Sequence, residues 1–185
     1  MERLRVAAFC VYLATWLVFV IAAVTSAIPV RGRQVDGSAR MTVPAIIGLL
    51  MQVAAALTVT LSMGSGPLRP RPFELVSTLA LAPLAASLFV WALRSTTNTV
   101  DAEVLATGGA YAWLRHPIYL AFLAMLVATG LLISAGLKLA AAVVLYLAGS
   151  ELRIVSEEAE LSRRFPVRFA QYRLRTRWRY LPGLR

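Results

Sequence analysis

Apolar residues in this chain gather into five long runs, which polar or proline-rich segments separate. The runs cover residues 6–28, 42–63, 75–93, 117–134 and 139–154. A helix needs about 20 predominantly apolar residues to cross the hydrocarbon core of a bilayer, and the first four runs come near this length. The pattern predicts an all-α integral membrane protein with about five transmembrane helices. The tight turn at 134–136 joins the last two as a C-terminal helical hairpin.

The fifth run differs from the others because it has only 12 uncharged residues, 139–150, before Glu151. We expect either a tilted span or a span whose charged end begins inside the membrane interface. Glu151 and Arg153 would then lie near bilayer depth, where an ionisable group suggests a functional site.

The connections between the runs are polar and divide the chain. Residues 29–41 contain three arginines, and residues 64–72 contain three prolines and two glycines, which exclude a continuous helix. The longest connection is 94–116. We therefore divide the chain into an N-terminal three-span membrane region, 1–94, and a C-terminal region, 95–185, which holds the long connection, the hairpin and a basic tail.

The composition excludes a soluble domain. Hydrophobic residues make up 59% of the chain, charged residues 15%, and the mean hydropathy is +0.70. The uncharged stretch 6–30 has 25 residues, longer than the core of about 7–15 residues in a cleaved signal peptide, so we interpret it as a retained span. Cys10 is the single cysteine and His116 the single histidine, so we expect neither a disulfide framework nor a zinc or haem site.

The net charge of +10 comes largely from the C-terminal end, where nine of the 19 Lys and Arg residues lie from Arg153 onward. Nucleic acid is one possible partner. Because the chain is already anchored in a membrane, we favour anionic membrane lipids and expect no nucleic-acid partner. Placing the C-terminus in the cytoplasm puts 14 of the 19 basic residues there. The positive-inside rule therefore predicts that 94–116 and the tail face the cytoplasm.

The only histidine lies in a polar and aromatic motif that opens the fourth run. Pro117 is favoured at the first position of a helix, so we expect the fourth span to begin there. The unpaired N–H groups of that helix end, with Arg115 and His116, would suit an anionic group such as a carboxylate. An equally open interpretation is that Arg115, Trp113 and Tyr119 only form an interfacial belt.

A second charged motif follows the fifth run. Arg153 and Glu157 are spaced as an i, i+4 pair, and Glu158 shares a face with Ile154 and Leu161. A carboxylate on an apolar face needs a buried partner, although a solvated charged helix is the more common structure for such a segment. The tail, 166–185, alternates arginines with aromatic residues, which favours an amphipathic segment on anionic lipid.

Three sequence patterns occur together in the C-terminal region. The first reads Gly-x-Tyr-x-x-x-Arg-His-Pro-x-Tyr over 109–119, the second Glu-Glu-x-x-Leu-x-x-x-Phe over 157–165, and the tail ends Arg-aromatic-Leu-Pro at 179–182. Together they resemble the isoprenylcysteine carboxyl methyltransferase family, which is related to the phospholipid methyltransferases. The resemblance covers about 105–182, and the first three spans resemble only generic membrane helices.

The resemblance implies S-adenosylmethionine as the cofactor and assigns roles to ten residues. It implies that Arg153 and Arg94 are catalytic and hold the carboxylate of the substrate. It also implies that the following residues form the cofactor pocket: Leu105, Gly109, Tyr111, Arg115, His116, Tyr119, Glu157 and Glu158.

Methyl transfer between a sulfonium cation and a carboxylate neutralises both charges, so it needs a dry pocket and no strong base. Our first hypothesis is therefore methylation of a carboxylate on a lipidated or apolar small-molecule acceptor, at the cytoplasmic face. The first alternative is N-methylation of a phospholipid, for which Glu157 or Glu158 would be the base. An NADPH-dependent reductase of the sterol-reductase type and a membrane scaffold without enzymatic activity are the others.

Overall fold

The computed structural model describes residues 2–27, 42–61, 70–97, 105–133, 135–181 and 183. These residues form six α-helices, one 3-10 helix and no strand, which confirms the all-α prediction. The helices are α1 (Glu2–Ala27), α2 (Val43–Thr60), α3 (Pro72–Thr97), η1 (Gly109–Ala112), α4 (Pro117–Leu132), α5 (Leu137–Arg164) and α6 (Pro166–Arg175).

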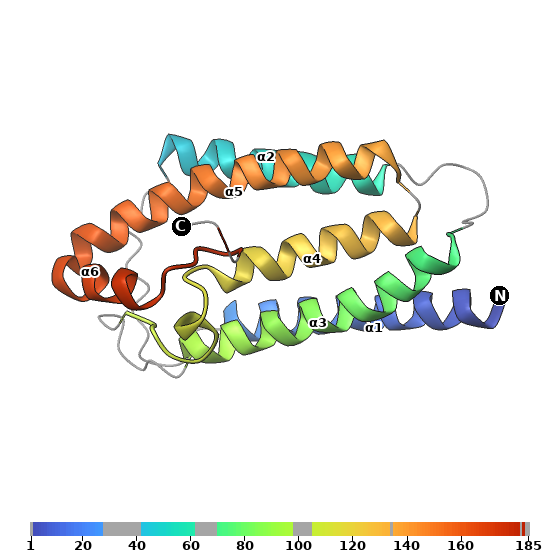
Figure 1. The fold of residues 1–185 in the computed structure, drawn as a ribbon, viewed down its shortest axis with the longest axis horizontal. Coiled ribbons are helices and arrows are strands. Elements are labelled where there is room, and N and C mark those ends of the chain that lie inside the picture. Colours follow the sequence, from blue (N-terminus) through green and yellow to red (C-terminus); the bar gives the residue numbers. More distant parts are fainter. Residues whose placement is uncertain are drawn as a thin grey trace.

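The five long helices run up and down along the long axis, with α4 between the pair α2 and α5 and the pair α1 and α3 (Figure 1). By length and composition, α2, α3 and α5 could each cross a membrane, while 6–22 of α1 and the whole of α4 are shorter apolar helices. Large apolar side chains point outward along the bundle, including Leu17, Leu50, Leu84 and Val144. Such a surface suits lipid, and the chain is an integral membrane protein.

The fifth apolar run and the charged motif after it form one unbroken helix. α5 has 28 residues, about 42 Å at 1.5 Å per residue, which exceeds a hydrocarbon core of about 30 Å. Its charged end therefore projects beyond its apolar part, toward η1, α6 and the tail (Figure 1). The depth of Glu151 and Arg153 in a bilayer stays a prediction.

Small residues and stacked rings hold the layers together. α2 and α5 approach closely at Gly48 and Gly149, where a Cβ on Gly48 would lie 2.4 Å from the Gly149 carbonyl oxygen. Phe19 of α1 stacks on Phe89 of α3 with ring centroids 4.4 Å apart. Thr78 of α3 donates a hydrogen bond to the Ala128 carbonyl of α4, 3.2 Å away.

The predicted N-terminal and C-terminal regions pack on each other, α2 against α5 and α3 against α4. Whether they are separate domains stays a prediction. Residues 28–41, 62–69 and 98–104 and residue Ser134 lie outside the described residues, so the expectations for those connections are untested.

Candidate active site

η1 is anchored on the end of α3 by a glycine that no other residue could replace without strain. Gly109 has φ +59°, in the left-handed region, and a Cβ there would lie 2.2 Å from the Ser95 hydroxyl oxygen. The neighbouring Ala110 N–H donates to that same oxygen at 3.2 Å. Gly109 therefore positions the segment that leads to His116.

The tail lies against the segment that begins α4. The Arg115 N–H donates to the Trp178 carbonyl at 3.0 Å, and the His116 N–H donates to the Arg179 carbonyl at 2.8 Å. These two consecutive bonds fix 176–181 beside the start of α4. The tail therefore closes over this part of the molecule.

A buried ion pair joins α4, α5 and the tail. Arg115 Nε donates to Glu158 Oε1 at 2.8 Å, and both residues are 6% exposed. Arg115 Nη1 donates to the carbonyls of 176 and 177 at 2.8 and 2.9 Å, and Arg179 Nη2 lies 3.7 Å from Glu158 Oε2. A buried pair is stable only when further hydrogen bonds satisfy its remaining atoms, as these contacts do. Glu158 has the buried partner that its apolar face predicted.

His116 lies between two carboxylates at the start of α4. Its Nδ1 is 3.5 Å from Glu157 Oε2, and its Nε2 is 3.4 Å from Glu158 Oε1. Burial by itself lowers the pKa of His116, but hydrogen bonds to Glu157 and Glu158 and their charges outweigh it, so the pKa lies above its usual value. The geometry favours the imidazolium form, which can donate to both carboxylates.

Glu157 is the carboxylate that faces open space, and its side chain is 39% exposed. The Tyr119 hydroxyl donates to its Oε1, and Arg153 Nη2 lies 3.6 Å from the same oxygen. The predicted i, i+4 pair of Arg153 and Glu157 is thus present. Burial, together with the charge of Glu157, raises the pKa of Tyr111 to about 12, so this phenol stays neutral at physiological pH.

Arg153 is held from three sides. Its Nη1 donates to Gln52 Oε1 at 2.8 Å, and its guanidinium carbon lies 5.3 Å from the centre of the Tyr119 ring. Glu157 supplies the third side. The guanidinium therefore has a defined position before any substrate arrives.

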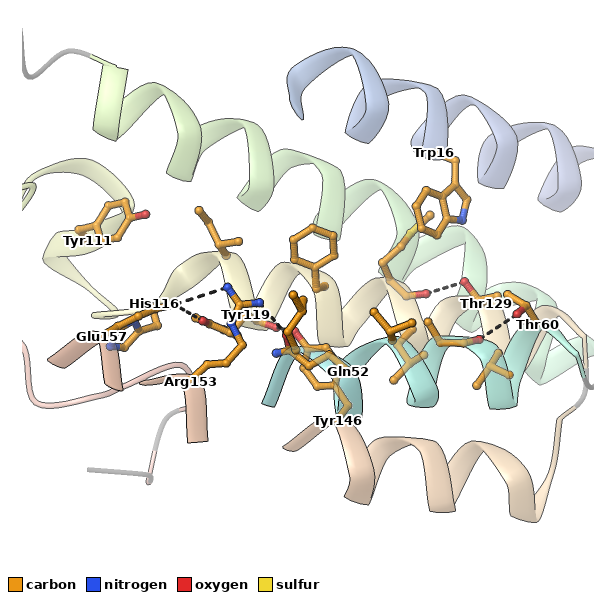
Figure 2. Close-up of a pocket in the computed structure, with 18 residues that line it drawn as sticks. Trp16, Gln52, Thr60, Tyr111, His116, Tyr119, Thr129, Tyr146, Arg153 and Glu157 are labelled. Atoms are coloured by element: carbon orange, nitrogen blue, oxygen red, sulfur yellow. Dashed lines mark hydrogen bonds and ion pairs between the residues drawn. The ribbon is translucent and has the colours of Figure 1, made fainter. Parts of the chain in front are cut away.

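These side chains form the polar end of a cavity of about 470 Å³. Figure 2 shows Tyr111, His116, Arg153 and Glu157 at one end, and Trp16, Thr60 and Thr129 toward the other. Most of the remaining lining is apolar and comes from α2 and α4: Leu49, Val53, Ala56, Val59, Ile118, Phe122, Met125 and Leu126. The cavity therefore suits a molecule with one charged end and one apolar end.

The structure brings five of the ten predicted site residues together in this cavity and places the other five elsewhere. The residues in its lining are Tyr111, His116, Tyr119, Arg153 and Glu157. Arg115 and Glu158 pair with each other next to His116, and Gly109 lies against Ser95 in the segment that leads to His116. Leu105 instead lines a separate cavity of about 500 Å³ beside α6. Arg94 is exposed in the last turn of α3 and is not among the described residues that line either cavity.

Sequence reasoning missed three residues near the polar end. Gln52 lines the cavity from α2, and its Nε2 donates to Ser150 Oγ at 2.9 Å. The Tyr146 hydroxyl donates to the Tyr119 carbonyl at 2.9 Å and so ties α5 to α4. The sequence did offer one indication of a role for Gln52, because it is the only amide side chain in the apolar run 42–63. Ser150 and Tyr146 resemble ordinary membrane-helix residues in the sequence.

Residues 76–163 match the model of the Isoprenylcysteine carboxyl methyltransferase (ICMT) family. The match confirms the family that the three sequence patterns indicated. It contains most of α3, the whole of η1 and α4, and nearly all of α5, whereas α1, α2, α6 and the tail lie outside it. No curated protein and no solved structure matches the chain significantly.

Proposed function

Because residues 76–163 carry a domain of the ICMT family of membrane methyltransferases, we propose that the protein transfers a methyl group from S-adenosylmethionine to a carboxylate on a lipidated or apolar acceptor. One observation supports this proposal most directly. Arg153, with Tyr119, His116 and Glu157, forms the charged end of a cavity whose other end is apolar. An acceptor with a carboxylate and a lipidic chain matches both ends.

The cofactor would be held by four residues of the polar end, which come from η1, the start of α4 and α5: Tyr111, His116, Tyr119 and Glu157. Aromatic faces attract a sulfonium cation, and a carboxylate suits the hydroxyl or amino groups of an adenosyl group. When bound, S-adenosylmethionine supplies an electrophilic methyl group. Arg115, Glu158, Gly109 and Leu105, which resemble cofactor-binding residues of the family, would support that pocket from behind or beside it.

The acceptor carboxylate would bind Arg153. A guanidinium carries five N–H donors, and the contacts to Gln52 and Glu157 involve only two of its nitrogens. Its planar geometry allows two parallel hydrogen bonds to one carboxylate, which orients the attacking oxygen. A carboxylate is already ionised at neutral pH, so no residue has to remove a proton. Arg94 stays a second candidate through the resemblance, although it lies at the end of α3.

The apolar walls would exclude water from the reacting groups. Both partners carry charge that disappears as the methyl group moves, so a water-poor site favours transfer over separation of the ions. Phe122, Met125 and Leu126 supply such walls beside Tyr119. The bilayer-facing helices would admit the lipidic acceptor, and the polar end would receive the cofactor from the cytoplasm.

A phospholipid amine is the second candidate acceptor, since Glu157 faces the cavity and could take a proton from it. Tyr119, His116 and Arg153 already bind this carboxylate. These three contacts make proton uptake by Glu157 less favourable. We therefore place the carboxylate acceptor first.

We also propose that α6 lies on the anionic lipid of the cytoplasmic leaflet. Its apolar Val167 and Leu174 are 68% and 78% exposed, next to the exposed side chains of Arg168 and Arg175. Exposed apolar and basic residues on one short helix suit the boundary between acyl chains and negative headgroups.

The experiment is a tritiated-methyl assay on the full chain in lipid nanodiscs, with N-acetyl-S-farnesyl-L-cysteine and phosphatidylethanolamine as separate acceptor probes. We expect label on the first probe, released as methanol by mild alkali, as an ester requires. Arg153→Ala should lower turnover by roughly 100-fold or more because two charge-assisted hydrogen bonds are lost. The matched control is Arg163→Ala, an exposed arginine on the same helix, which should retain activity.

Label on phosphatidylethanolamine alone would favour the amine acceptor. Calorimetric titration that detects NADPH but not S-adenosylmethionine would favour a reductase instead. A protein that binds neither would favour the scaffold hypothesis.

A further inference from the structure

A residue outside the family match holds the proposed acceptor-binding arginine. Gln52 Oε1 accepts a hydrogen bond from Arg153 Nη1 at 2.8 Å, and Gln52 Nε2 donates to Ser150 Oγ at 2.9 Å. Ser150 Oγ in turn donates to the Tyr146 carbonyl at 2.8 Å. Both polar atoms of the Gln52 amide are therefore engaged, which fixes the direction in which its oxygen points.

Gly48, one helical turn before Gln52, makes room for the stem of Arg153. A Cβ on Gly48 would lie 2.7 Å from Arg153 Cγ, and a Cβ on Gly149 would lie 2.6 Å from the Gly48 carbonyl oxygen. The stem of Arg153 therefore lies across the bare backbone of α2. Residues i and i+4 share a helix face, so the guanidinium that passes over Gly48 meets the Gln52 amide on that same face.

Arg153 is contacted by a neutral side chain of α2, Gln52, and by a charged side chain of α5, Glu157. Glu157 partly balances the guanidinium charge at 3.6 Å, whereas the Gln52 amide orients the guanidinium and carries no charge. The positive charge of Arg153 is therefore still available to an anionic ligand in the cavity. A long arginine side chain loses rotamer freedom when it binds a ligand, and this loss is smaller if the side chain is already fixed.

We propose that Gln52 is a positioning residue for acceptor binding, which fixes Arg153 in the geometry that receives the acceptor carboxylate. The inference rests on the proposed function, in which Arg153 binds that carboxylate. It assigns part of the acceptor site to α2, a helix that the family match does not include. The substrate class it implies is a carboxylate acceptor, because a neutral or cationic head would gain nothing from a fixed guanidinium.

The test compares two variants with similar side-chain size, assayed in nanodiscs with N-acetyl-S-farnesyl-L-cysteine. Gln52→Met removes the hydrogen bond but keeps the length, and it should raise the KM for the probe roughly 10- to 100-fold because the guanidinium loses its fixed position. The KM for S-adenosylmethionine should change less than about twofold, since the hydrogen bonds of Gln52 described above go to Arg153 and Ser150 and to no proposed cofactor residue. Leu50→Ala, a 62% exposed position on the same helix, is the control and should match the wild type.

Gln52→Glu separates positioning from packing. Glutamate keeps the side-chain length and an oxygen that can accept from Arg153, so a merely structural role predicts near-normal kinetics. If the charge of Arg153 has to stay available, the new carboxylate should compete with the probe, and the probe KM should rise at least as far as in Gln52→Met. Near-normal probe KM in either variant would overturn the proposal, and so would an equal rise in both substrate KM values.

A double-variant experiment decides whether Gln52 acts through Arg153. Probe affinity is measured by calorimetric titration, because the low turnover expected of Arg153→Ala makes its KM hard to determine. Adding Gln52→Met to Arg153→Ala should cause no further loss of affinity, whereas independent roles would give additive losses and contradict the proposal. If the wild type binds and methylates no carboxylate probe, the proposed function fails, and this inference fails with it. Wild-type turnover with a normal Gln52→Met variant would remove the inference alone.

Discussion

Neighbouring side chains in the two motifs have separate tasks. Arg115 and Glu158 pair with each other and with the tail, while His116 and Glu157 turn toward the cavity. Consecutive residues of a helix point about 100° apart, so a pair of adjacent glutamates on α5 necessarily faces two directions. The sequence could indicate that both glutamates matter, but it could not tell which one lines the cavity.

The environment of His116 makes a prediction for stability against pH. Its pKa is raised in the folded protein by Glu157 and Glu158, against the effect of burial, with Arg115 and Arg153 as the nearby cations. Because the pKa of His116 is higher in the folded than in the unfolded protein, protonation of His116 stabilises the fold. This stabilisation is complete at a pH below the pKa of the unfolded state, about 6.5, and is lost as the pH rises through the pKa of the folded state.

We therefore expect thermal unfolding of His116→Gln to lie furthest below the wild type near pH 6, with the difference shrinking toward pH 9. The measurement is the unfolding midpoint of both proteins in detergent across that range, and Arg163→Ala provides a control without a histidine change. A difference that grows with pH would contradict the assignment of the imidazolium form.

At the scale of elements, the apolar runs predicted the long helices well because length and composition alone decide them. The runs 42–63 and 117–134 correspond to α2, Val43–Thr60, and α4, Pro117–Leu132. The sequence did not predict that α5 is one continuous helix. Charged residues from Glu151 onward end its apolar pattern, but the helical backbone continues to Arg164. The sequence could not predict which helices cross closely, because a single glycine in an apolar run does not indicate which helix it contacts.

The crossing of α2 and α5 makes the second prediction. Gly149→Ala places a Cβ 2.6 Å from the Gly48 carbonyl oxygen, so the two helices must separate. Overpacking of this kind costs about 1–3 kcal/mol, and close approach of small residues is a main source of stability between membrane helices. We expect a lower thermal midpoint in detergent together with a weaker Gln52 contact to Arg153.

The matched control is Gly108→Ala, because a Cβ there meets no atom within 4 Å and the glycine has φ −99°. This substitution should leave the midpoint near that of the wild type. Equal midpoints for the two alanine variants would show that the crossing tolerates a wider spacing.

For the whole molecule, the motifs indicated which segments meet, and the structure adds how they are held. The resemblance assigned His116, Glu157 and Glu158 to one pocket, and the contacts of His116 with both glutamates show that the start of α4 and the acidic end of α5 meet. The contribution of α2 could not be predicted, because Gln52 is separated from Arg153 by 101 residues and belongs to no motif. The contact of the tail with Arg115 could not be predicted either. Arg115 bonds backbone carbonyls of the tail, and because every residue has a carbonyl, no sequence pattern marks these.

Orientation in the membrane gives a third prediction, which belongs to the whole molecule. Charge counting places α6 in the cytoplasm and the turn before α5 on the opposite side. In a Cys10→Ser background, Arg175→Cys should react with a membrane-impermeant maleimide only in inside-out vesicles. Leu137→Cys, at an 86% exposed position, should react only in right-side-out vesicles. The reverse pattern would place the active site on the other face.

The backbone bonds from Arg115 and His116 to Trp178 and Arg179 have a consequence for biosynthesis. The helices that enclose the cavity are translated before the tail, yet Arg115 lacks its carbonyl partners until 176–177 have left the ribosome. A nascent chain that has inserted its helices but has not released this tail lacks the contacts that hold Arg115 and His116 at the start of α4. We therefore expect the site to reach its final geometry only after translation has passed the tail.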